Sequence, residues 1–268
     1  MTNAIVRTID PRARDLGGGF HVRRVLPFHA HKMVGPVTYL FEGAIRHKDS
    51  LGSDLVIRPG AVNWMTAGHG IVHSERTPAP EREAGQSMHG LQTWVALPVT
   101  HEDMPPSFVH HPADTLPTFV ISGADIRVLA GEAWGHRSPV SFPWPILYAA
   151  IETPNGASMV LPATLAEERA LYLVSGGVTV DGSQIGEGVM VVFTPGVDIA
   201  VEFLPGTKAV ICGGASLDGA RNIDWNFVAS SADRIDQAKQ DWNESIRLHG
   251  TERFPFVPGD DTEWIPLP

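Results

Sequence analysis

Residues 64–75 read Trp-Met-Thr-Ala-Gly-His-Gly-Ile-Val-His-Ser-Glu, and the interpretation of the whole chain starts from this stretch. His73 and Glu75 are two positions apart, so in an extended strand both side chains point to the same face. An imidazole and a carboxylate placed in this way can bind one metal ion. Gly68 and Gly70 suit a backbone that is strained or closely approached just before the strand.

A second pair with the same spacing, His29 and His31, lies upstream in a region punctuated by glycine and proline. Together with His73 and Glu75, this pair would give three imidazoles and one carboxylate from two strands. Nitrogen-rich ligation favours iron, nickel, copper or zinc over magnesium or calcium. We therefore predict that His29, His31, His73 and Glu75 bind one divalent transition metal.

The composition favours a β protein that does not bind polyanions. The chain has 27 Gly and 22 Pro, which are too many for a helical bundle but fit short strands joined by turns. A net charge of −10 argues against direct binding to nucleic acid or to an anionic membrane. The single Cys212 cannot form an internal disulfide. The sequence shows neither a signal peptide nor an apolar window of about 18 residues, so we expect a soluble cytoplasmic protein.

One β unit occurs twice in the sequence. Tyr-Leu-Val-Ser-Gly at 172–176 repeats Tyr-Leu-Phe-Glu-Gly at 39–43. Gly-Glu-Gly at 186–188 precedes an apolar run, as Arg-Pro-Gly does at 58–60. Two copies of this unit, with short strands at close spacing, predict a duplicated β-barrel. Eleven of the twelve histidines lie at or before position 136, so the metal site is expected in the first barrel alone.

We divide the chain into an N-terminal barrel at 1–137, a second barrel without metal ligands at 138–229 and a tail at 230–268. Three prolines between Ser138 and Pro145 suggest a linker there. In the tail, Ser230 or Ser231 can cap a helix that Gly250 ends. This helix should pack back on a barrel through apolar residues that fall on one face, namely Ile235, Ala238, Trp242 and Ile246.

These motifs closely resemble the pirin family of the cupin superfamily. The resemblance is carried by the string at 64–75, the strand at 37–43, His-Lys-Asp-Ser-Leu-Gly at 47–52 and Pro-Gly at 59–60. It implies an all-β bicupin, that is, two jelly-roll barrels, with one mononuclear metal held in the N-terminal cupin by His-x-His and His-x-Glu. The metal is usually iron, so we expect Fe(II), with Ni, Cu, Zn and Mn as alternatives.

One departure from the family pattern concerns the first ligand pair. Pirins carry His-Pro-His before the strand at 37–43, whereas this chain has His29-Ala-His31. Counted back from Glu42, these histidines sit at the family's distance, which makes them ligands. In a second alignment, residues 22–27 and 33–36 match an earlier strand and the ligand loop is deleted, so His29 and His31 bind no metal. Both alignments remain open.

The resemblance implies a dioxygenase similar to quercetin 2,3-dioxygenases, which cleave a flavonol-like substrate with O₂. In this reading Glu75 is both a ligand and a catalytic proton acceptor. His47 is expected near the metal ligands or at the surface, and four residues are candidates for lining the substrate pocket: Phe41, Trp64, Met65 and Trp94. The alternative is a non-catalytic pirin-like regulator that binds a protein partner and uses its metal as a structural or redox element, or has a degraded metal site.

Overall fold

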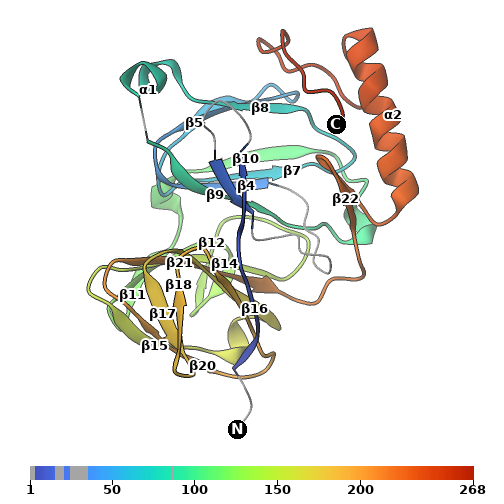
Figure 1. Cartoon of the computed structure of the whole chain (residues 1–268). Helices are drawn as coiled ribbons and strands as arrows, with labels where there is room; N and C mark the ends of the chain where they lie inside the picture. Colours follow the sequence, from blue (N-terminus) through green and yellow to red (C-terminus); the bar gives the residue numbers. More distant parts are fainter. Residues whose placement is uncertain (1–3, 16–20, 25–35, 86) are drawn as a thin grey trace. The chain divides into compact units, whose positions relative to one another are not determined.

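A computed structural model describes residues 4–15, 21–24, 36–85 and 87–268 of the chain (Figure 1). The chain divides into two compact units, and each unit combines two separate stretches of sequence. Residues 29–115 and 217–268 form what we call the N-terminal cupin unit. Residues 1–28 and 116–216 form the C-terminal cupin unit.

The N-terminal cupin unit is built on two antiparallel sheets. The first has the order β10-β7-β4-β9, with bounds Ser107–His111, Val62–Thr66, Pro36–Glu42 and His89–Trp94. The second has the order β6-β5-β8, with bounds Asp54–Ile57, Ile45–Asp49 and His73–Arg76. Leu40 from the first sheet packs in one apolar cluster with Ile57 and Ile45 from the second. These contacts show that the two sheets face each other, as in a cupin barrel.

The tail of the chain adds a hairpin and a helix to this unit. The hairpin pairs β22 (Asn222–Asp224) with β23 (Phe227–Ala229), and helix α2 (Ala232–Leu248) lies beside β22 (Figure 1). Ser231 caps α2 because its side chain accepts a hydrogen bond from the Arg234 amide. Short helices are α1 (Ala79–Ala84) and the 3-10 turns Val99–His101 and Ala113–Thr115.

The buried face of α2 matches the sequence prediction except at its last turn. Ile235, Ala238 and Trp242 are buried as expected. The fourth buried residue is Ser245 rather than the predicted Ile246, and its hydroxyl donates to the Phe254 carbonyl at 2.5 Å. A polar contact with the chain beyond the helix therefore fixes the last turn. No helix in the described part of the chain is both long and apolar enough to cross a membrane.

The C-terminal cupin unit also consists of two main sheets. The larger has the order β1-β19-β16-β21-β14-β12-β11, with bounds Ile5–Ile9, Met190–Phe193, Glu168–Ser175, Thr207–Gly214, Ile146–Thr153, Ala124–Ala133 and Thr118–Ile121, and β13 (His136–Arg137) pairs with β12. The smaller has the order β15-β20-β17-β18, with bounds Ala157–Leu161, Ile199–Phe203, Gly177–Val180 and Ser183–Gly186. A 3-10 turn spans Ala163–Leu165, and β2 (Arg12–Asp15) pairs with β3 (His21–Arg24).

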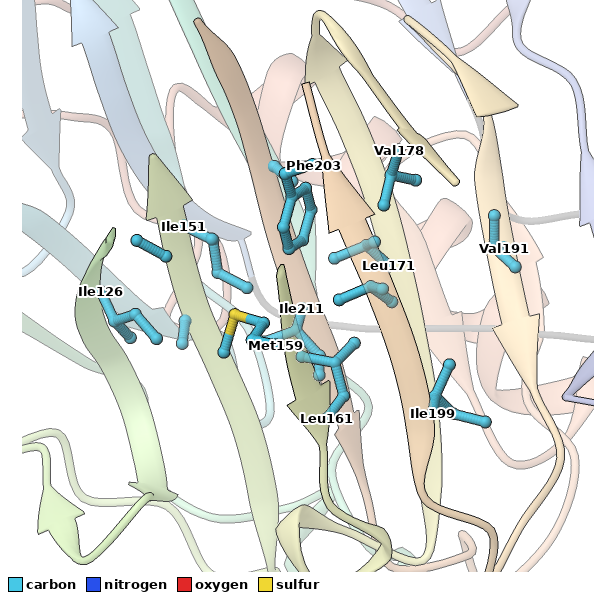
Figure 2. Close-up of a cluster of buried hydrophobic side chains, with 14 of the residues drawn as sticks. Ile126, Ile151, Met159, Leu161, Leu171, Val178, Val191, Ile199, Phe203 and Ile211 are labelled. Atoms are coloured by element: carbon cyan, nitrogen blue, oxygen red, sulfur yellow. The ribbon is translucent and has the colours of Figure 1, made fainter. Parts of the chain in front are cut away.

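The interior of the C-terminal cupin unit is filled by apolar side chains. Strands of both sheets contribute to one cluster, which includes Ile151, Leu171, Phe203 and Ile211 (Figure 2). Leu171 and Ile211 are fully buried. At about 25 cal/mol per Å² of apolar area, such burial is the main term that stabilises a barrel of this size. Buried polar side chains also occur in this unit, and among them the Arg169 guanidinium donates to backbone carbonyls such as that of Pro162.

The pairing of strands confirms the predicted duplication. In the N-terminal cupin unit β4 lies between β7 and β9, and in the C-terminal cupin unit β16 lies between β19 and β21. Tyr39 pairs with Val62 on β7, and Tyr172 pairs with Met190 on β19. The two tyrosine strands therefore occupy the same position in their sheets, and the predicted all-β bicupin fold with a C-terminal helix is confirmed.

The division into units differs from the consecutive segments expected from sequence. Strand β12, which precedes the proposed linker at Ser138–Pro145, pairs with β14, which follows it, so both belong to one sheet. Strand β1 pairs with β19 of the C-terminal cupin unit, and α2 belongs to the N-terminal cupin unit. The prolines at 138–145 thus lie in a connection inside a unit. A proline-rich stretch interrupts strands in a loop as readily as at a boundary.

Candidate metal centre

The two glycines before β8 occupy positions that a side chain would not tolerate. Gly68 has φ +51°, and a Cβ there would lie 2.0 Å from the Met104 carbonyl oxygen. Gly70 has φ +152°, and a Cβ there would lie 2.8 Å from the Phe254 ring. The prediction of a strained and closely approached backbone at these glycines is confirmed. They let the chain turn tightly into the strand that carries His73 and Glu75.

Strand β8 brings His73 and Glu75 beside a second pair on β5. The register places His73 opposite Asp49 and Glu75 opposite His47. Directly opposed residues share a face of a sheet, so all four side chains lie on the inner face of this sheet. The His47 and His73 rings stack with their centroids 5.8 Å apart.

His47 and Asp49 form a buried polar pair. His47 Nε2 lies 3.1 Å from Asp49 Oδ2, and both side chains are buried. Asp49 Oδ1 accepts hydrogen bonds from the backbone amides of Leu51 and Ser53. The His47 ring stacks on Phe108 of the facing sheet at 4.0 Å. His47 is therefore an interior residue next to His73, and its Nε2 is occupied by Asp49.

His73 is held in an environment that favours its neutral form. The residue is exposed to solvent, yet neighbouring atoms crowd the ring, and the resulting partial desolvation lowers the pKa of His73. The neighbouring His47 lowers that pKa further, while Glu75 opposes the effect. A neutral imidazole has a free nitrogen lone pair, which is the form that binds a metal.

The Glu75 carboxylate reaches across to the facing sheet. The Thr38 hydroxyl of β4 donates to Oε1 at 3.1 Å, and Gln92 Nε2 of β9 donates to Oε2 at 2.8 Å. Each carboxylate oxygen has two acceptor sites, so one remains on each oxygen for a metal. Hydrogen bonds of this kind orient a ligating carboxylate and tune its basicity.

The described donors suit a divalent transition metal in their chemistry, although they do not complete its coordination. His73 offers an imidazole nitrogen and Glu75 a carboxylate oxygen on the same face of one strand. Within residues 4–15, 21–24, 36–85 and 87–268, no three His, Cys, Asp or Glu side chains form a ligand group. The other two predicted ligands, His29 and His31, lie outside the described residues.

The back of β8 is attached to the C-terminal tail. Ser74 and Arg76 alternate with the candidate ligands and point to the opposite face. The Asp260 carboxylate accepts hydrogen bonds from the Ser74 hydroxyl at 2.6 Å and from two Arg76 nitrogens at 2.7 Å each. Lys48 on β5 donates to the Gly259 carbonyl at 3.0 Å. The tail therefore holds the strand from behind.

Sequence reasoning missed the residues that support Glu75. Thr38 and Gln92 give no local signal, because they meet Glu75 only through the facing of two sheets. The pair His47-x-Asp49 did carry a signal, since it has the same spacing as His73-x-Glu75. Of the four candidates for the pocket, Met65 lies on the inner face with Asn63, while Trp64 points to the other face.

Comparison with known proteins adds an independent finding. The chain matches the family model described as Pirin over residues 5–95 and that described as Pirin C-terminal cupin domain over residues 148–247. It is 43% identical to a pirin-like protein from Caulobacter vibrioides, over 97% of this chain and 98% of that one.

Two solved structures resemble the chain along much of its length. A quercetin 2,3-dioxygenase from Acinetobacter baumannii is similar with a TM-score of 0.86 and 28% identity, covering 98% of this chain and 95% of that one. A bacterial pirin from Escherichia coli in complex with nickel(II) is similar with a TM-score of 0.53 and 22% identity, covering 69% and 73% of the respective chains. The second likeness concerns the fold alone.

Proposed function

Because this chain belongs to the pirin family, we propose that it is a metal-dependent dioxygenase that uses O₂ to open the ring of a flavonol-like aromatic substrate. The observation that carries the proposal is the placement of His73 and Glu75 on one inner face, with both Glu75 oxygens held by the facing sheet. The similarity to a quercetin 2,3-dioxygenase over nearly the whole chain supports the choice of substrate class. A cytoplasmic location remains part of this proposal.

The proposed ligands are His29, His31, His73 and Glu75, and the proposed metal is Fe(II), with Ni, Cu, Zn and Mn as alternatives. The donor types fit this group of metals. A pirin of the same fold has been solved with nickel(II), which supports the presence of a metal in this barrel. When bound, a divalent cation would lower the pKa of a hydroxyl on the substrate and so favour its reactive anionic form.

The residues of the chain would supply proton transfer and orientation. Glu75 would accept the hydroxyl proton at a carboxylate oxygen, within reach of the metal ligands. Thr38 and Gln92 would keep that carboxylate in place by the two hydrogen bonds that they donate. His47, fixed between Asp49 and Phe108, would keep the His73 ring stacked in its position.

Metal analysis combined with quercetin turnover in air and without oxygen tests the proposal. We expect about one equivalent of metal per chain, oxygen-dependent loss of quercetin, and loss of both properties in His73→Ala. His136→Ala is the matched control, because His136 is exposed and belongs to the C-terminal cupin unit. Stoichiometric metal without turnover, together with a protein partner recovered by pull-down, would favour the non-catalytic regulator instead.

A further inference from the structure

A row of polar side chains crosses the inner face of the four-stranded sheet in the N-terminal cupin unit. The register pairs His110 with Asn63, Asn63 with Thr38, and Thr38 with Gln92. Residues paired in this way lie side by side on one face. Because Thr38 and Gln92 both donate to Glu75, this face is the one that looks toward β8.

The two halves of this polar row differ in their partners. Thr38 and Gln92 are committed to Glu75. In the other half, His110 Nδ1 lies 2.8 Å from Asn63 Oδ1 and donates to it. Burial lowers the pKa of His110, which keeps the ring neutral and able to donate from one nitrogen. In this arrangement the Asn63 amide oxygen faces His110 and the amide nitrogen is directed away from the histidine.

The Asn63 amide nitrogen has no hydrogen-bond partner among the described residues. The residue is only 2% exposed, and Nδ2 is buried without a hydrogen bond to any described part of the chain. Exchanging the amide oxygen and nitrogen would not remove the problem, since the oxygen would then take the unpaired position. A buried polar atom without a partner costs about 1–3 kcal/mol, so its presence in a folded barrel needs an explanation.

Two aromatic side chains border the polar row on the same face. Phe108 is two residues from His110 on β10, and Trp94 is two residues from Gln92 on β9, so both share the inner face. Both are only half-buried, and the Phe108 ring stacks on His47. A ligand beside Asn63 would thus lie near aromatic side chains and one available hydrogen-bond donor, the Asn63 amide nitrogen.

We propose that Asn63 is a substrate-binding residue whose amide N–H donates to an acceptor oxygen of a planar aromatic ligand, and that His110 holds the amide in this orientation. This inference rests on the proposed function, because it places the ligand next to Glu75. In this proposal, the sheet that faces the metal ligands recognises the acceptor oxygen of the substrate. The unpaired amide is then satisfied only when the ligand is bound.

The inference is tested by measuring, through fluorescence and in the absence of oxygen, how tightly quercetin binds to the nickel(II)-loaded protein. Asn63→Leu should weaken quercetin binding about tenfold, the effect of losing one hydrogen bond to a buried acceptor. Its nickel content should stay unchanged. Its thermal midpoint without quercetin should change little, because the variant removes the unpaired amide nitrogen but also the oxygen that accepts from His110. Asn63→Ala repeats the binding test if leucine does not fit.

Two control variants separate the inference from general damage. Asn222→Leu makes the same substitution at a half-buried asparagine on β22, and His111→Ala changes the neighbour of His110 on the opposite face; both should bind quercetin like the wild type. His110→Ala should weaken binding, as Asn63→Leu does. Unchanged affinity in both Asn63 variants would overturn the inference and leave the proposed function standing. Failure of the wild type to bind quercetin would overturn both.

Discussion

Replacing Asp260 with asparagine should loosen the C-terminal tail from the strand that carries the candidate ligands. The Asp260 carboxylate binds Arg76 through two hydrogen bonds and Ser74 through one. Both partners lie on β8, on the face opposite to His73 and Glu75. Asparagine keeps the shape of the side chain but removes its charge, so the substitution tests the ion pair rather than the packing.

The size of the effect follows from the electrostatics of the pair. Hydrogen bonding to Arg76, with smaller contributions from Ser74 and Lys48, lowers the pKa of Asp260 from 3.8 to about 2. This difference corresponds to at most about 2.4 kcal/mol of stability. Because the Arg76 side chain is 45% exposed, solvent screens part of the interaction. We therefore expect Asp260→Asn to lower the free energy of unfolding by about 1–2 kcal/mol near neutral pH.

Urea denaturation of the wild type and the variant at several pH values measures this loss. The pKa of Asp260 is lower in the folded chain than in the unfolded one, so its contribution is present above about pH 4 and disappears as the pH falls toward about 2. The difference between the two proteins should be constant near neutrality and shrink in acid. Hydrogen exchange should rise in residues 255–268 of the variant.

Asp54→Asn is the matched control. Asp54 makes two hydrogen bonds of 2.7 Å to Arg46, the same geometry as Asp260 with Arg76, but the pair joins neighbouring strands and is exposed on both sides. Its loss should have a smaller effect on stability and none on exchange in the tail. Equal effects of the two substitutions, or a difference that does not change with pH, would refute the reasoning.

Three further predictions concern the candidate site and the thiol. His73→Ala should lower nickel(II) affinity by at least about 10- to 100-fold in calorimetric titration. The His29→Ala/His31→Ala double variant should do the same if these residues are ligands. Unchanged metal content in the double variant would support a deleted ligand loop. Gln92→Leu should lower nickel(II) affinity about tenfold with little change in the urea midpoint, because this exposed side chain holds one Glu75 oxygen. Burial raises the pKa of Cys212 to about 11. A chromogenic disulfide reagent at about pH 8 should therefore react with this thiol only after the protein unfolds. Rapid reaction of the folded protein would contradict this prediction.

Local patterns were sufficient to predict the secondary structure around the site. The glycines at 68 and 70, the cap at Ser231 and the repeated tyrosine strands each depend on neighbours in sequence. The pairing of β1 with β19 could not be predicted in this way, because nothing in residues 5–9 specifies a partner near position 190. The contact between Asp260 of the tail and Arg76 of β8 could not be predicted either, because the two residues are 184 positions apart in the sequence.

The candidate site shows the same limit. The i,i+2 spacing was enough to place His73 and Glu75 on one face, since that relation belongs to a single strand. The support of Glu75 by Thr38 and Gln92 depends on how two sheets face each other, and the unpaired Asn63 amide depends on what surrounds it. Such relations arise from packing, which periodicity does not encode.

The N-terminal residues of the chain belong to the C-terminal cupin unit and the C-terminal residues belong to the N-terminal cupin unit, and this arrangement has a consequence for biosynthesis. The C-terminal cupin unit uses nothing beyond residue 216, whereas the N-terminal cupin unit also needs residues 217–268. On the ribosome, domains usually finish folding in the order in which they are made. Here the order is reversed, because the unit that contains the candidate ligands is the last to receive all its segments. Until residue 260 has left the ribosome, strand β8 lacks the tail that holds it. The nascent chain therefore passes through a stage in which the barrel with His73 and Glu75 is unfinished while the C-terminal cupin unit can already be folded.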